Sequence, residues 1–196
     1  MPKVVDHDAR RRSLIEASWD VIASEGIEGV TLRKVAAAAG CTTGRLTHYF
    51  SSRDDLILSA LRSVYADSAR RMVAIEKGEK DPETRLRHIV YEALPLNRTR
   101  LREWRVWIVF WAAATANDGL AAENAQRFKA WQRLLTKLIT DVSSRDQTEQ
   151  RAFELASMID GLGIRICLTT NRRTQAMART AVDEWVTRLV IEPDPA

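Results

Sequence analysis

The stretch VAAAAGCTTGRLTHYF, residues 35–50, joins a run of alanines to a glycine, two threonines and a basic and aromatic end, and it contains no acidic residue. The alanines favour a helix, because alanine has the highest helix propensity. Gly40 favours a turn, and Thr42 can cap a following helix by accepting a hydrogen bond from its first-turn amides. The stretch therefore predicts two short helices joined by a tight turn.

Positive charge is concentrated around this predicted turn. The 196-residue chain has a net charge of only +4. Between Thr31 and Arg53, however, every charged residue is basic. Such charge on a helix-turn-helix is typical of DNA binding, in which the second helix enters the major groove and the first braces it against the backbone. The alternative is a pair of ordinary surface helices, but the Thr, Gly, His and Tyr residues of the second helix are poor helix formers.

The rest of the chain predicts an all-α fold of about nine helices. Apolar residues recur at helical spacing, and prolines and glycines interrupt the pattern. The expected helices cover about 8–24, 31–40, 43–50, 52–76, 82–94, 99–116 and 119–142, then two final helices precede a tail at 192–196. A turn is expected at 143–146. We expect a DNA-binding domain at 1–53 and a ligand-binding and dimerisation domain at 54–196.

Several classes of protein fit the sequence poorly. The three histidines are scattered, neither of the two cysteines has a histidine at metal-ligand spacing, and no glycine-rich phosphate loop is present. We therefore predict neither an enzyme nor a protein with a metal or cofactor. No apolar run is long enough to cross a bilayer, and the two cysteines fit a reduced, cytoplasmic protein without a membrane partner.

The segment TLRKVAAAAGCTTGRLTHYFSSRDDL, residues 31–56, resembles the DNA-binding segment of the TetR family of bacterial transcriptional regulators. The resemblance implies a homodimer that binds a palindromic double-stranded operator and is controlled by a small-molecule inducer. Family members commonly have Tyr where this chain has Thr47, so an aromatic contact is missing there. By this resemblance, the candidates for base contacts are Arg33, Thr43, Gly44, Arg45 and His48, and those for phosphate contacts are Thr31, Thr42, Thr47, Tyr49 and Arg53.

Tryptophans crowd the segment EWRVWIVFW in the second half of the chain. Trp104, Trp107 and Trp111 are spaced to share one helix face. They predict either core packing or the walls of a pocket for a quaternary ammonium ion, which indole faces attract. The segments VWIVFWAAA and MIDGLGIRICLT resemble those of the regulators of choline and glycine betaine metabolism. Phe110 is a further candidate wall, and Glu92 and Asp160 are candidate counter-charges.

The two final helices each carry one apolar stripe that needs a cover. Two such helices from each of two chains would make a four-helix bundle, although the stripes could also pack inside a single chain. The candidate dimerisation residues are Leu155, Ile159, Leu162, Ile166, Val182, Trp185 and Leu189.

Taken together, these patterns predict a repressor that is released from its operator by an inducer, with a quaternary amine as the candidate. The alternatives are an architectural protein that coats DNA without sequence preference, or a regulator of efflux or catabolic genes with a neutral hydrophobic inducer.

Overall fold

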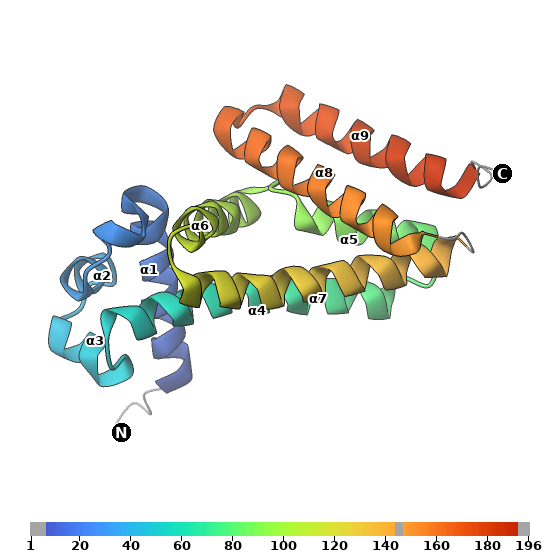
Figure 1. Cartoon of the computed structure of the whole chain (residues 1–196). Helices are drawn as coiled ribbons and strands as arrows, with labels where there is room; N and C mark the ends of the chain where they lie inside the picture. The colour runs from blue at the N-terminus through green and yellow to red at the C-terminus, as the bar shows by residue number, and fades with distance from the viewer. Residues whose placement is uncertain (1–6, 144–146, 192–196) are drawn as a thin grey trace, which may run out of the picture.

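The computed structural model describes residues 7–143 and 147–191, and within this part it contains nine helices and no strand (Figure 1). The all-α prediction is confirmed. The predicted tail at 192–196 and most of the predicted turn at 143–146 lie outside the described residues. None of the described helices is long and apolar enough to span a membrane. The helices are α1 (His7–Gly29), α2 (Leu32–Ala38), α3 (Thr43–Tyr49), α4 (Arg53–Gly78), α5 (Pro82–Ala93), α6 (Arg98–Ala114), α7 (Asp118–Val142), α8 (Thr148–Thr169) and α9 (Arg172–Ile191).

The turn between α2 and α3 has the predicted chemistry. Gly40 has a φ of 62°, in the left-handed region that favours glycine. The Thr31 hydroxyl accepts a hydrogen bond from the Lys34 amide at 3.2 Å, and the Thr42 hydroxyl accepts one from the Arg45 amide at 3.3 Å. Leu46 is fully buried below α3. The two short helices are therefore fixed by their caps and by one inward-facing side chain.

Helix α1 is longer than the prediction of 8–24. It extends to Gly29, with a break at Gly26, where φ is 71° and the backbone is not helical. A glycine accepts this conformation without strain, so the chain changes direction there and continues for another turn. The predicted turn is thus a kink inside one helical segment.

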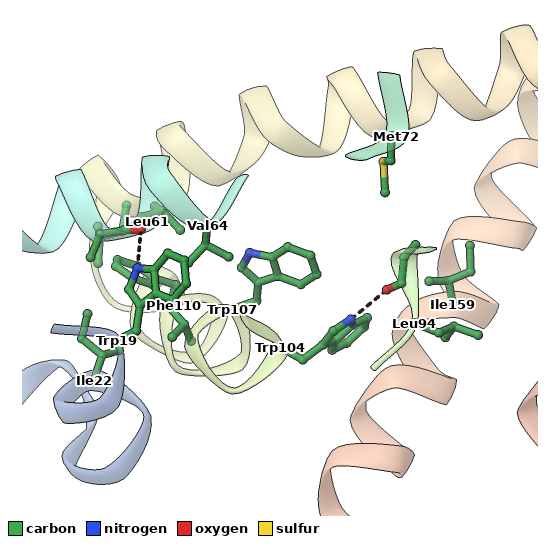
Figure 2. Close-up of a cluster of buried hydrophobic side chains, with 14 of the residues drawn as sticks. Trp19, Ile22, Leu61, Val64, Met72, Leu94, Trp104, Trp107, Phe110 and Ile159 are labelled. Carbon is green, nitrogen blue, oxygen red and sulfur yellow. Dashed lines mark hydrogen bonds between the residues drawn. The ribbon is translucent and has the colours of Figure 1, made fainter. Parts of the chain in front are cut away.

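Helix α1 is held by α4 and α6 as well as by α2. The Trp19 indole nitrogen donates a hydrogen bond to the Ala60 carbonyl in α4 at 3.2 Å (Figure 2). Arg12 pairs with Asp67 of α4 at 2.9 Å, and Arg102 of α6 pairs with Asp20 at 2.6 Å. The predicted division at residue 53 therefore separates segments that share one hydrophobic core.

Helices α8 and α9 lie side by side along one edge of the molecule (Figure 1). Five of the seven predicted dimerisation residues are buried inside the single chain. Leu155, Ile159, Ile166, Val182 and Leu189 are at most 2% exposed, because α5, α6 and α7 of the same chain cover them. Leu162 and Trp185 are half-buried. The large apolar side chains that are exposed on these two helices are instead Phe153, Ile164, Leu168, Met177, Val190 and Ile191.

Candidate nucleic-acid interface and ligand cavity

Helix α3 and the start of α2 present the predicted DNA-binding residues at one end of the molecule (Figure 1). Leu46 faces the core, so the residues around it on this short helix face outward. Tyr49 and Arg53 are partly buried. The predicted residues that are exposed are Thr31, Arg33, Thr42, Thr43, Gly44, Arg45, Thr47 and His48.

The arginines of this region differ in what their guanidinium groups contact. Within residues 7–143 and 147–191, Arg33 and Arg45 make no side-chain hydrogen bond or ion pair. Arg53, in contrast, donates to the carbonyls of Ile27 and Val30, the latter at 2.8 Å. Arg53 therefore secures the end of α1, which corrects its prediction as a phosphate contact, while Arg33 and Arg45 remain available for an external partner.

A ring cluster borders this surface. The Tyr49 hydroxyl lies 3.3 Å from Nδ1 of His7, and the His48 and Tyr49 rings meet edge to face at 5.4 Å. His7 was not predicted to belong here, because it lies 41 positions before His48 in the sequence and only the fold brings α1 beside α3. The cluster orients His48 at the rim of the exposed face.

A cavity of about 240 Å³ lies between α4, α6, α7 and α8. Three predicted tryptophans, Trp104, Trp107 and Trp111, line it together with Asp160. The further lining residues, which were not predicted, include Tyr65, Met72, Arg127, Phe128, Trp131 and Ile159. The cavity is therefore lined by aromatic side chains from three helices, α4, α6 and α7, and by Ile159 and Asp160 of α8.

The aromatic rings of the cavity pack against one another. Trp104 contacts Trp107 at 5.5 Å and Trp111 at 5.6 Å, both edge to face, while Tyr65 stacks on Trp107 at 5.6 Å. Phe128 lies 5.8 Å from Trp111. The π face of an aromatic ring attracts a cation, so a cavity lined by these rings is a candidate site for one. We call the rings of Tyr65, Trp104, Trp107, Trp111 and Phe128 the aromatic cage.

Trp104 is fixed in place at the centre of this cage. Its indole nitrogen donates to the Ala93 carbonyl at 2.7 Å (Figure 2), and its side chain is 2% exposed. Gly163 of α8 makes the space for it: a Cβ atom at this position would lie 2.0 Å from Cη2 of Trp104. The small residue lets α8 approach α6 closely around the indole.

Asp160 is the unpaired carboxylate of the cavity. Within the described residues its side chain has no hydrogen bond or ion pair, and burial alone raises its pKa to about 6. Burial favours the neutral form because a charge is poorly solvated away from water. A cationic ligand would reverse this effect by favouring the carboxylate.

Two predicted ligand residues lie elsewhere. Phe110 is fully buried in the core and does not line the cavity. Glu92 accepts hydrogen bonds from Arg71 at 2.6 Å and Arg100, and these outweigh burial and hold its pKa below the usual range. Its charge is therefore satisfied inside the protein, which corrects its prediction as a counter-charge for a ligand.

Family models match both halves of the chain. Residues 14–60 match the model described as bacterial regulatory proteins of the tetR family. Residues 82–191 match the model described as the C-terminal region of BetI-type transcriptional repressors. The first match covers the surface of α2 and α3, and the second covers α5 to α9, including most of the cavity.

Known transcriptional regulators are similar to this chain over most of its length. The chain is 29% identical to the HTH-type transcriptional regulator PksA of Bacillus subtilis over 98% of this chain and 95% of that protein. It is 31% identical to BetI of Burkholderia cenocepacia over 84% and 86% of the two chains. Among solved structures, a regulator from Saccharomonospora viridis in complex with choline has a TM-score of 0.85 and 25% identity, with 95% of this chain and 100% of that chain covered.

Proposed function

Because the chain belongs to the TetR family of bacterial transcriptional regulators, with a BetI-type C-terminal region, we propose that it represses its target genes until a quaternary ammonium compound enters the cavity. In this proposal, α2 and α3 bind a palindromic operator, and the ligand lowers the affinity of the repressor for that operator. The protein would act in the bacterial cytoplasm, where its DNA partner lies.

The observation that carries the ligand proposal is the aromatic cage with an unpaired carboxylate. Trp104, Trp107 and Trp111 supply π faces, and Asp160 supplies a negative charge without a partner among the described residues. A quaternary ammonium ion donates no hydrogen bonds, so it is bound by such faces and by charge rather than by acceptors. The Saccharomonospora viridis regulator in complex with choline supports the same class of ligand.

We further propose that the active form is a homodimer. The exposed apolar side chains Ile164, Leu168 and Met177 of α8 and α9 are the candidates for the interface. Leu168 is 79% exposed and Met177 63% exposed in the single chain, so both side chains are open to contact with a partner chain. A dimer that binds two half-sites of a palindromic operator must hold its two copies of α3 about 34 Å apart, one turn of DNA, or a multiple of that distance.

Helix α6 provides a route from the cavity to the DNA-binding surface. Trp104 faces the cavity, whereas Arg102, two residues earlier, faces α1 and binds Asp20 and the Glu16 carbonyl. A ligand that moves α6 would therefore move α1 and, with it, α2 and α3. Only a ligand whose affinity differs between the two positions of α6 can shift their equilibrium.

A gel-shift titration tests this proposal. The purified protein is mixed with DNA from upstream of its own gene, with excess competitor DNA at fixed salt, and choline or a neutral hydrophobic compound is added. We expect a specific shift that choline weakens about 5- to 150-fold, the usual range of allosteric coupling. A specific shift that only the neutral compound releases would reject the ligand class. Binding without sequence preference would favour the architectural alternative.

The free arginine of α3 gives a second prediction. Replacing Arg45 by Ala should weaken binding to the specific operator by about 1 to 3 kcal/mol, because a bidentate contact to guanine is lost. Binding to random DNA should fall far less. Arg133→Ala, which removes another exposed charge, far from α3 on α7, is the matched control. Equal losses for the two variants would show that Arg45 does not read bases.

A further inference from the structure

His7, the first residue of α1, lies against the end of α3. Its ring centre is 6.0 Å from that of Tyr49 and 6.3 Å from that of His48, and its Nδ1 atom lies 3.3 Å from the Tyr49 hydroxyl. The next turn of α1 is tied to α4, because Arg11 donates a hydrogen bond to the Ser59 hydroxyl at 2.9 Å. The fold therefore holds an ionisable ring at the border of the exposed face of α3.

The pair formed by His7 and Tyr49 is open to an external partner. The His7 side chain is exposed, and that of Tyr49 is half-buried. Within residues 7–143 and 147–191, the Nε2 atom of His7 has no hydrogen-bond partner. Side chains at the edge of a helix that lies in the major groove meet the sugar-phosphate backbone. A phosphate is therefore the group of the operator that this position can reach.

The charge of His7 decides how many hydrogen-bond donors the pair offers. A neutral imidazole has one N–H and tyrosine has one O–H, and the hydrogen bond between the two side chains uses one of these donors. An imidazolium has two N–H groups, so Nδ1 then donates to the Tyr49 oxygen, and both the Nε2–H and the Tyr49 O–H are free. Protonation thus raises the number of free donors from one to two and adds a positive charge. A phosphate is anionic and accepts hydrogen bonds, so it binds the protonated pair more tightly.

Other ionisable groups surround His7, but only DNA distinguishes the free protein from the complex. The titratable groups of α3 that face His7 are the Tyr49 hydroxyl and the His48 ring. These groups and the charges of α1 and α4 act on His7 with or without DNA, whereas a phosphate acts only in the complex. Binding of the phosphate is therefore coupled to protonation of His7. The charged residues of α1 within four positions of His7 are Asp8, Arg10 and Arg11, and Arg11 interacts with Asp55 of α4.

We propose that His7, together with Tyr49, binds a phosphate of the operator backbone, and that protonation of His7 strengthens this contact. The affinity for the operator then rises as the pH falls through the range in which histidine ionises. This inference rests on the proposed binding of an operator by α2 and α3, and it adds a contact from α1 that depends on pH.

Gel-shift titrations of the full chain at pH 6 and pH 8, with the same operator DNA, test the inference. We expect the wild type to bind about 10-fold more tightly at pH 6 for each chain bound, as one additional hydrogen bond to a charged group allows. The salt dependence is a second readout. The slope of the logarithm of affinity against the logarithm of salt concentration should be steeper at pH 6 by about 0.9 for each chain bound, because one more phosphate is neutralised. A residue that only supported Tyr49 would not change this slope with pH.

Glutamine variants assign the effect to one histidine. His7→Gln keeps a hydrogen-bonding side chain that cannot be protonated, so it should lose the pH dependence of both the affinity and the slope. His48→Gln should retain the pH dependence, even if its overall affinity is lower. His88→Gln is the control, because His88 is exposed on α5, at the other side of the molecule from α3 (Figure 1). Urea unfolding checks the fold of each variant, and His7→Gln should unfold at the wild-type urea concentration because its side chain is exposed.

The outcomes distinguish the His7 contact from operator binding itself. The inference is wrong if the wild type binds the operator equally at pH 6 and pH 8, or if His7→Gln keeps the pH dependence. It is also wrong if His48→Gln or His88→Gln abolishes the pH dependence as fully as His7→Gln does. If the wild type binds no operator specifically at either pH, the proposed operator binding fails as well, and His7 has no such contact.

Discussion

Replacing Gly163 by Ala should destabilise the protein by about 3 kcal/mol, the upper part of the range for an overpacked core. The added methyl group would lie 2.0 Å from Cη2 of Trp104 and 2.3 Å from Cζ2 and Cζ3. The indole cannot turn away easily, because it is buried and its nitrogen donates to the Ala93 carbonyl. Either that hydrogen bond is lost or α8 moves away from α6. The gain of up to about 1 kcal/mol in helix propensity does not offset this loss.

Gly161→Ala is the matched control for this substitution. Gly161 lies two residues earlier in α8, and an added Cβ would meet nothing within 4 Å. This variant should be neutral or more stable by up to about 1 kcal/mol. Urea unfolding at one protein concentration measures both. If the two variants unfolded at the same urea concentration, the tight packing of α8 against Trp104 would be refuted.

Replacing Asp160 by Asn should stabilise the protein at neutral pH. Burial raises the pKa of Asp160 to about 6 in the fold, whereas an unfolded aspartate ionises near 3.8. As pH rises from about 4 to 6, the unfolded chain therefore loses a proton that the fold retains, and stability falls by up to about 3 kcal/mol. Asparagine has no such proton. The gain in the free energy of unfolding of Asp160→Asn over the wild type should be complete above pH 6 and should disappear as pH approaches 4.

The same substitution should weaken ligand binding. Without the carboxylate, the affinity for choline should fall about 10- to 100-fold, because an attraction between opposite charges in a partly buried site is lost. In the wild type, protonation of Asp160 competes with the cation, so affinity should fall about 4-fold between pH 7.5 and 5.5. Asp160→Asn should remove this pH dependence. Calorimetric titrations at the two pH values measure both effects.

Asp183→Asn provides a control of opposite sign. Although partial burial opposes ionisation of Asp183, hydrogen bonds from Tyr91 and Arg87 keep its pKa below the usual range. Its contribution to stability is therefore present above the unfolded pKa and lost as pH falls, so this variant should be less stable at neutral pH. If Asp160→Asn also destabilised the protein at neutral pH, the Asp160 carboxylate would have a stabilising partner in the fold, and the prediction would be wrong.

The sequence predicted features that neighbouring residues determine. The caps by Thr31 and Thr42 and the left-handed Gly40 all follow from local chemistry, and all three are present. The break of α1 at Gly26 also depends on a glycine, but a single glycine does not say whether a helix stops or resumes. Helix existence was therefore easier to predict than helix ends.

Residues that act through distant neighbours were harder to predict. The apolar stripe of α8 correctly indicated burial of Leu155 and Ile159, but periodicity cannot say whether the covering helix belongs to the same chain. Tyr65 and Arg127 were missed because they join the tryptophans only through the packing of α4 and α7 on α6. Glu92 was misassigned because its partners Arg71 and Arg100 come from two other helices.

The attachment of α1 has a consequence for recombining regulators of this kind. Arg102 and Asp67 both lie beyond residue 53, yet they bind Asp20 and Arg12 of the first helix. A chimera joined at residue 53 would pair a foreign α1 with these two residues and leave their charges without matched partners. A chimera that responds to its inducer at a new operator would therefore have to exchange α1 together with the residues of α4 and α6 that bind it. The segment that must be transferred to change operator specificity is larger than the predicted DNA-binding domain.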